Sequence, residues 1–109
     1  MSKVKPAPLP PDTPVGGYRI VRRLAAGGFG LVYLATDADG QQVAIKEYVP
    51  ATLATREPGQ LCPKVAPEKL SLYRLGLKSF FEEGRALAQI SHASVVSVLN
   101  FFRENETVY

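Results

Sequence analysis

One stretch decides the fold of this 109-residue chain, Leu24-Ala25-Ala26-Gly27-Gly28-Phe29-Gly30-Leu31-Val32. Its three glycines fall within four residues, between two strand-like runs at 18–24 and 31–36. Glycine reaches positive φ without steric cost, so the backbone between the two runs can turn sharply or approach another group closely. The pattern predicts a β-hairpin with a glycine-rich tip, whose amides can lie over phosphate groups without side-chain obstruction.

Length and composition restrict the remaining fold classes. The length predicts one domain, and with 46% hydrophobic and 21% charged residues the chain can bury a core and is not a disordered protein. Its apolar runs are far shorter than the roughly 20 residues of a membrane span, and the N-terminus lacks a secretory apolar region, so we expect a cytoplasmic protein. Cys62 is the only cysteine, which excludes an internal disulfide and a cysteine-based metal site. The net charge of +3 is too small to indicate a nucleic-acid partner.

Residues 1–17 hold five of the nine prolines. This composition favours an extended arm that buries too little apolar surface to order itself, so we predict a flexible, disordered proline-rich tail at 1–17 and a folded domain at 18–109. A docking peptide for a proline-binding domain is the alternative interpretation of the tail.

A third strand is predicted at 42–48, after a turn at 37–40 that ends in glycine. Side chains alternate along a strand, so Ala44, Lys46 and Tyr48 share one face. By the same alternation, the other face carries Val43, Ile45 and Glu47. Lys46 therefore has a small alanine two residues before it, on its own side of the sheet.

The proline-containing segment 49–66 is predicted to be irregular, with at most a short helix near 51–55. A helix is expected from Pro67 to about Ser91, with a break near Gly76 as an alternative. On a helical wheel one broad apolar arc contains Leu70, Tyr73, Leu77, Phe80, Phe81, Leu87, Ala88 and Ile90. Lys78, Glu82, Arg85 and Gln89 fall opposite, whereas Glu83 falls within the arc, where a buried carboxylate would need a partner.

Two further strands are expected at 95–102 and 107–109, separated by a turn at 104–105. The predicted fold is α+β: a five-stranded antiparallel sheet with one main helix packed on it. The glycine loop, Lys46 and Glu83 would then form a consistent set. Glycine amides can cover phosphates, an ammonium can neutralise phosphate oxygens, and a carboxylate can hold the ammonium in place.

The sequence resembles the protein kinases, in detail the bacterial Ser/Thr protein kinases of eukaryotic (Hanks) type. The glycine-loop pattern G-x-G-x-F-G-x-V appears as Ala25-Ala26-Gly27-Gly28-Phe29-Gly30-Leu31-Val32, and V-A-I-K appears as Val43-Ala44-Ile45-Lys46. Phe80-Phe81-Glu82-Glu83-Gly84 looks like the family's C helix, which would end at Ile90-Ser91-His92. The resemblance covers residues 18–109 and implies the N-terminal lobe of a kinase that transfers the γ-phosphoryl group of ATP to protein hydroxyls.

By this resemblance, Lys46 would contact the α- and β-phosphates of ATP and pair with Glu83, which makes these two the candidate catalytic residues. The phosphates would be covered by Ala26, Gly27, Gly28, Phe29 and Gly30. The adenine pocket would be lined by Leu24, Val32 and Ala44. The implied cofactors are ATP and Mg²⁺, and the implied partners are a protein substrate and the C-terminal kinase lobe.

Three features depart from the family pattern. Ala25 replaces the first glycine of the loop, and the segment before the helix is longer than usual. Nothing corresponds to the H-R-D-x-x-x-x-N catalytic loop or to D-F-G, so the ligands of Mg²⁺ would lie outside this chain and we expect no phosphoryl transfer by the chain alone. The single histidine, His92, is interpreted as structural.

Other nucleotide-binding folds fit poorly. A Rossmann domain needs a helix after its glycines, and a Walker loop needs G-K-[ST], whereas Gly30 is followed by the strand-like Leu31-Val32. The alternative from another functional class is a non-catalytic, pseudokinase-like or truncated module for nucleotide binding or protein interaction. An uncovered surface toward the absent lobe would also favour self-association.

Overall fold

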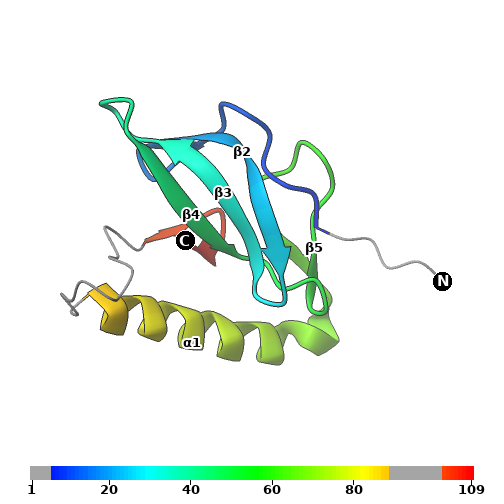
Figure 1. Cartoon of the computed structure of the whole chain (residues 1–109). Helices are drawn as coiled ribbons and strands as arrows, with labels where there is room; N and C mark the ends of the chain where they lie inside the picture. The colour runs from blue at the N-terminus through cyan, green and yellow to red at the C-terminus, as the bar shows by residue number, and fades with distance from the viewer. Residues whose placement is uncertain (1–5, 89–101) are drawn as a thin grey trace.

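The structure is a computed structural model that describes residues 6–88 and 102–109. An antiparallel sheet lies over one long helix (Figure 1). The sheet contains, in spatial order, β1 (Pro14–Val15), β2 (Tyr18–Gly27), β3 (Gly30–Thr36) and β4 (Gln42–Tyr48). The helix α1 (Leu70–Ala88) follows a single 3₁₀ turn, η1 (Pro67–Lys69). The described residues also contain two short hairpins: β5 (Ala54–Thr55) with β6 (Lys64–Val65), and β7 (Arg103–Glu104) with β8 (Thr107–Val108). The predicted α+β class is confirmed.

The glycine hairpin has the predicted form. Gly27 pairs with Gly30, and Gly28 and Phe29 make the two-residue turn between β2 and β3. Gly30 has φ of +145°, and a Cβ there would collide with the backbone of Glu47 and Val49. Glycine is required at position 30 because the end of β4 passes this close to the loop.

The predicted five-stranded sheet is wrong in its membership. The strands expected at 18–24, 31–36 and 42–48 are confirmed as β2, β3 and β4. The strand expected at 107–109 is present as β8, but it pairs with β7 and not with the main sheet. The strand expected at 95–102 lies outside the described residues, apart from Phe102. The fourth strand of the sheet is β1, which the sequence had placed in the tail.

The prediction of a flexible tail is wrong for residues 6–17. Leu9 and Val15 are 2% and 0% exposed, and β1 pairs with the start of β2. The amide of Leu9 also donates a hydrogen bond of 3.0 Å to the hydroxyl of Tyr33. Proline content suggested disorder, but the apolar residues between the prolines bury enough surface to order this segment.

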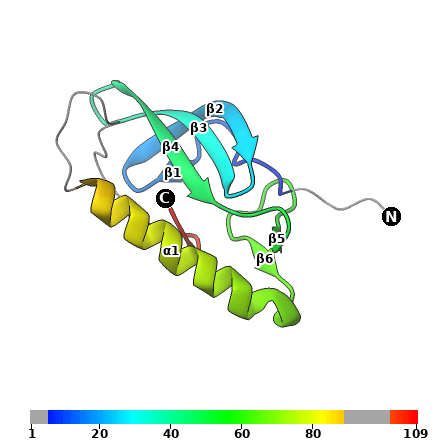
Figure 2. The ribbon, with the colours of Figure 1, turned by 60° about the horizontal axis from the view of Figure 1, so that its bottom comes forward.

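Segment 49–66 also differs from its prediction. No helix forms in it; a turn at 51–53 leads into the β5–β6 hairpin, which lies beside the start of α1 (Figure 2). Arg56 turns inward from this segment and is 1% exposed. An irregular connection was expected because of its prolines, yet a buried arginine anchors it to the sheet.

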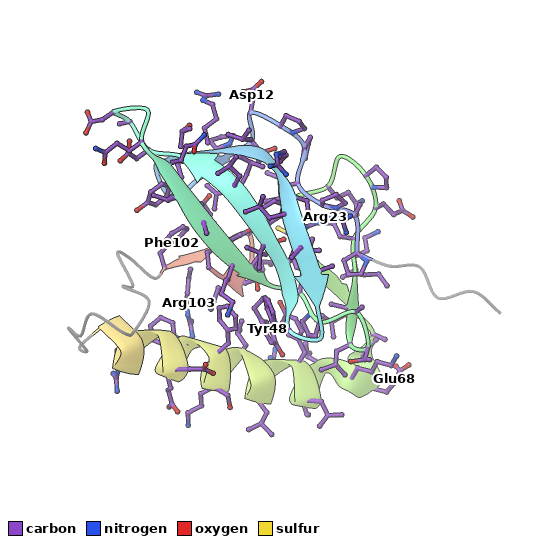
Figure 3. All side chains as sticks on the ribbon, viewed as in Figure 1. Asp12, Arg23, Tyr48, Glu68, Phe102 and Arg103 are labelled. Carbon is purple, nitrogen blue, oxygen red and sulfur yellow. The ribbon has the colours of Figure 1, made fainter. Side chains whose placement is uncertain are left out.

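The helix begins at Pro67 as predicted, and α1 continues through Gly76 without a break. A Cβ at Gly76 would collide with the hydroxyl of Tyr48, which donates a hydrogen bond of 3.0 Å to the carbonyl of Tyr73. The glycine therefore allows β4 to pack against the helix, and Tyr48 lies between the two (Figure 3).

Most described residues of the apolar arc face the core, because Tyr73, Leu77 and Phe80 pack against it. Glu83 is the exception: it is exposed, so the wheel's prediction of a core-facing Glu83 is wrong. Gln89, Ile90 and the expected helix end at Ser91 lie outside the described residues, as do the side chains of Leu87 and Ala88. Within residues 6–88 and 102–109, no helix combines the length and apolarity that a membrane crossing requires.

Candidate functional site

Lys46 lies directly beside the tip of the glycine loop. Its Nζ atom is 4.7 Å from the centroid of the Phe29 ring, close enough for a cation–π contact. The loop is tied to the same strand by its backbone, since the amide of Val49 donates a hydrogen bond of 3.0 Å to the carbonyl of Phe29. The structure thus brings together the loop and the lysine that the sequence predicted to act together.

Two of the predicted adenine-lining residues, Val32 and Ala44, share the face of the sheet that carries Lys46. Val32 pairs with Lys46 across β3 and β4, and Leu34 pairs with Ala44, so Val32 and Ala44 lie on this face. Leu24 lies at a bulge of the neighbouring strand β2 and is 45% exposed. Because Ala44 and Lys46 are also exposed, we name this side of the sheet the open face.

The predicted pair of Lys46 and Glu83 is not formed. Among the described residues the ion pairs within 4.0 Å are Arg56 with Glu47 and Lys78 with Glu82. Glu83 follows Phe80 by three residues, nearly one helical turn. Lys46 in β4 and Glu83 in α1 lie on elements that pack against each other through Tyr48 and Tyr73. The role of Glu83 as a partner of Lys46 stays a prediction.

An aromatic stack connects the loop to the helix, and sequence reasoning missed it. The ring of Phe29 stacks with that of Phe80 at a centroid distance of 6.4 Å. Phe80 also contacts Tyr48 at 5.5 Å, and Tyr48 contacts Tyr73 at 5.2 Å. Lys46 thus lies over the ring at one end of an aromatic cluster that spans the loop tip, the end of β4 and α1.

A second charged cluster lies on the opposite face of β4. The carboxylate of Glu47 accepts hydrogen bonds from Arg56 Nη1 and Nη2 at 2.8 and 2.7 Å, and from the hydroxyls of Tyr33 and Tyr109 at 2.7 Å each. Glu47 and Tyr33 are 0% exposed. We name this side of the sheet, with these four side chains, the closed face. The sequence had a signal for it, since alternation placed Glu47 with the apolar Val43 and Ile45.

The closed face perturbs its own ionisable groups. Burial, followed by the charge of Glu47, raises the pKa of Tyr33 and of Tyr109 well above the ordinary tyrosine value. Burial alone would lower the pKa of the Arg56 guanidinium, but the hydrogen bonds and charge of Glu47 raise it. Arg56 therefore keeps its positive charge, and the tyrosines keep the protons that they donate.

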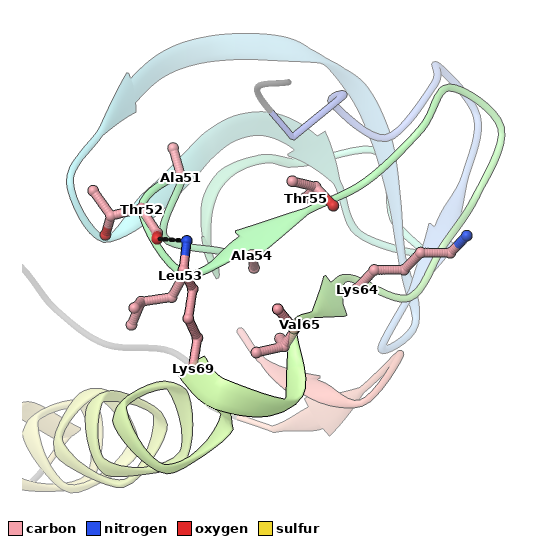
Figure 4. Close-up of a pocket in the computed structure, with 9 residues that line it drawn as sticks. Ala51, Thr52, Leu53, Ala54, Thr55, Lys64, Val65 and Lys69 are labelled. Atoms are coloured by element: carbon pink, nitrogen blue, oxygen red, sulfur yellow. Dashed lines mark hydrogen bonds between the residues drawn. The ribbon is translucent and has the colours of Figure 1, made fainter. Parts of the chain in front are cut away.

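A cavity of about 270 Å³ lies elsewhere, between the turn at 51–53, the β5–β6 hairpin and the 3₁₀ turn η1 (Figure 4). Its lining includes Leu53, Val65, Lys64 and Lys69, and Lys69 Nζ donates a hydrogen bond of 3.2 Å to the carbonyl of Thr52. None of the predicted site residues lines this cavity. In the part of the chain that the structure describes, no group of three His, Cys, Asp or Glu side chains could hold a metal ion.

Comparison with known proteins relates both the fold and the sequence to protein kinases. No protein-family model matches the chain. The solved structure of PpkA-294 in its apo form matches 93% of this chain and 36% of that chain, with a TM-score of 0.85 and 35% sequence identity. Serine/threonine-protein kinase Pkn1 of Myxococcus xanthus is 33% identical over 85 residues, which is 78% of this chain and 10% of the relative.

Two shorter matches point the same way. The probable serine/threonine-protein kinase PkwA of Thermomonospora curvata is 47% identical over 45 residues, 39% of this chain and 6% of the relative. Serine/threonine-protein kinase AfsK of Streptomyces coelicolor is 56% identical over 32 residues, 29% of this chain and 4% of the relative. The chain thus spans a tenth or less of the length of these curated relatives.

The antiparallel sheet, the glycine hairpin and the packed helix α1 define the N-terminal lobe fold of a protein kinase. By its sequence relatives, the chain belongs to the bacterial, eukaryotic-type Ser/Thr protein kinase family.

Proposed function

We propose that the chain forms the ATP-binding lobe of a Ser/Thr protein kinase, with the nucleotide on the open face of the sheet. One observation carries the proposal: the ammonium of Lys46 lies 4.7 Å from the ring of Phe29, at the tip of the loop whose amides would cover the phosphates. Loop and lysine converge on one place, as phosphate binding requires.

The chemistry of the residues on the open face and in the glycine loop fits a nucleoside triphosphate. Gly28 has open space around it, so its amide can approach an anion without side-chain obstruction. Lys46 makes no ion pair within the described residues, and its charge is available to phosphate oxygens. Val32, Ala44 and Leu24 provide apolar surface for the base. Bound ATP with Mg²⁺ would supply the transferable phosphoryl group.

Glu83 would complete the site after a small rearrangement. Lys46 now contacts the Phe29 ring, and Phe29 stacks on Phe80, which precedes Glu83 by three residues. Withdrawal of the Phe29 ring would let the ammonium reach toward this turn of α1. The proposed roles are therefore phosphate contact for Lys46, orientation of Lys46 for Glu83, and phosphate covering for the amides at 26–30.

Calorimetric titration of the full chain with Mg-ATP tests the proposal. We expect saturable binding that weakens by about tenfold or more in Lys46→Met, because a hydrogen bond to a charged group contributes about 1.5–3 kcal/mol. Lys64→Met is the matched control, since it removes an exposed lysine beside the separate cavity. Absence of binding by the unmodified chain, or equal losses in both variants, would contradict the proposal.

The second candidate is a nucleotide-binding or interaction module without phosphoryl transfer. The unpaired Lys46 and Glu83 favour it, because kinase activity in this family requires that pair. We expect no incorporation of phosphate by the chain alone. Incorporation that is lost in Lys46→Met would contradict this expectation. A protein substrate, the C-terminal lobe and self-association remain the proposed partners.

A further inference from the structure

Arg56 joins four segments that are distant in the sequence. Besides its bidentate pair with Glu47, its Nε donates a hydrogen bond of 2.9 Å to the carbonyl of Ala7, and its Nη1 donates one of 3.2 Å to the carbonyl of Leu61. Nη2 also donates to the hydroxyl of Tyr33 at 3.1 Å. The backbone of Arg56 accepts a hydrogen bond of 2.7 Å from the amide of Ala7. The N-terminal segment, β3, β4 and the connection before α1 thus meet at one guanidinium.

The residues that Arg56 holds are sequence neighbours of the predicted site residues. Glu47 follows Lys46 in β4, and Tyr33 follows Val32 in β3. Val32 and Lys46 are themselves paired across the two strands. Because successive side chains point to opposite faces, fixing Tyr33 and Glu47 on the closed face also fixes where Val32 and Lys46 emerge on the open face.

The glycine loop is attached at the same place. Val49, two residues after Glu47, donates its amide hydrogen to the carbonyl of Phe29, and Gly30 lies against the backbone of Glu47. The end of β4 therefore carries Lys46 and also holds the loop tip, so a distortion of this strand end would disturb the contact between Lys46 and Phe29. No direct contact between Arg56 and the open face is needed for this coupling.

Energetics favours a positioning role over a purely stabilising one. A buried ion pair is often no more stabilising than a well-packed apolar pair, because desolvation offsets the attraction. A bidentate guanidinium–carboxylate pair does, however, fix the relative orientation of its partners. Such a pair beside a candidate site can therefore act through the geometry that it imposes on its neighbours.

We propose that Arg56 is a positioning residue, which acts through Glu47 and Tyr33 to hold Lys46 against the tip of the glycine loop. This inference rests on the proposed function for its consequence in nucleotide binding. Its structural part, the dependence of Lys46 on Arg56 across the sheet, stands independently of any ligand.

The decisive variant is Glu47→Leu/Arg56→Met in the full chain. Replacement of both partners leaves no lone buried charge, so we expect this variant to be more stable than Arg56→Met alone. Arg56→Lys keeps the positive charge but cannot form the bidentate pair with Glu47, so it should change the Lys46 signal in the same direction but by less. Lys64→Met, an exposed change in the same connection, is the control.

The readout is the NMR chemical shift of the ε-methylene protons of Lys46, which the ring current of the nearby Phe29 alters. The variant Phe29→Leu gives this chemical shift in the absence of the ring. In the folded double variant we expect the signal to move toward the Phe29→Leu position and the dissociation constant for Mg-ATP to rise about tenfold, because preorganisation is lost. The control should change neither.

A folded double variant that keeps the Lys46 signal of the unmodified chain would overturn the inference, whatever its thermal stability. If the unmodified chain fails to bind Mg-ATP, the proposed function fails, and the Lys46 signal alone then supports or overturns the positioning role. A loss of thermal stability with an unchanged Lys46 signal would identify Arg56 as merely structural.

Discussion

Strand β4 separates two faces with opposite properties. On the open face Lys46 is exposed, and its ammonium lies over the ring of Phe29. On the closed face the next residue, Glu47, is 0% exposed and accepts four hydrogen bonds. A charge that is to bind a ligand must not be neutralised by an ion pair within the protein, whereas a buried charge must be paired. The difference separates the proposed binding role of Lys46 from the structural role of its neighbour Glu47.

The largest expected effect is on the closed face. Glu47→Ala leaves the Arg56 guanidinium buried without its partner, and we expect the free energy of unfolding to fall by about 3–5 kcal/mol. Urea denaturation followed by circular dichroism measures this loss. The double variant Glu47→Leu/Arg56→Met should recover most of it. If Glu47→Ala lowers the free energy of unfolding by less than the double variant does, an unpaired buried Arg56 carries no large penalty, and this prediction is wrong.

The glycine loop offers a smaller, positional contrast. Gly30→Ala places a Cβ against the backbone of Glu47 and Val49 at a φ of +145°, so we expect a loss of about 2–4 kcal/mol in unfolding free energy. Gly28→Ala, which has no atom within 4 Å of its added Cβ, should cost well under half as much. Equal losses measured by thermal denaturation would contradict the close approach of β4 to the loop.

Alkaline pH should act on the closed face. The pKa values of Tyr33 and Tyr109 are raised in the folded state by burial and by Glu47, so both stay protonated when the unfolded chain ionises. Their stabilisation is complete below about pH 10 and is lost as pH rises, by about 1.4 kcal/mol per pH unit for each residue. Tyrosinate absorbance should therefore rise together with the loss of helical circular dichroism. Ionisation of these two residues in a chain that stays folded would contradict the account.

The smallest stability effect is expected on the open face. Lys46→Met removes an exposed cation–π contact, which contributes about 0.5–1 kcal/mol, and leaves the closed face intact. Thermal denaturation should show a change of no more than this size. A loss comparable to that of Glu47→Ala would mean that Lys46 has a structural role that its exposure does not indicate.

The sequence predicted the open face better than the closed one, for a physical reason. The glycine hairpin, the strand with Lys46 and the helix from Pro67 depend on local chemistry and periodicity, which a sequence displays directly. Arg56 and Glu47 are nine residues apart, in a strand and in a connection that composition described only as irregular. Their pairing depends on how the connection folds back over the sheet, so no local sequence pattern predicts it.

The same reason explains the other errors. Prolines at 6–14 indicated a tail, but Val15 is buried in β1 and Leu9 is buried where its amide bonds to Tyr33. Composition does not show such contacts with distant segments. Gly76 indicated a helix break, yet its purpose is the close approach of Tyr48 from another element. Glu83 fell on the apolar side of an ideal wheel, whereas in the folded chain it is exposed.

The most direct test of the central claim is an amide chemical-shift map of the full chain during titration with Mg-ATP. We predict that the largest shifts fall on the open face and its loop, at Gly27, Gly28, Gly30, Val32 and Lys46, and that Arg56 and the cavity residues Lys64 and Lys69 shift little. Saturating shifts that are centred on Lys64 and Lys69, or no shifts at all, would contradict the assignment of the nucleotide site to the open face.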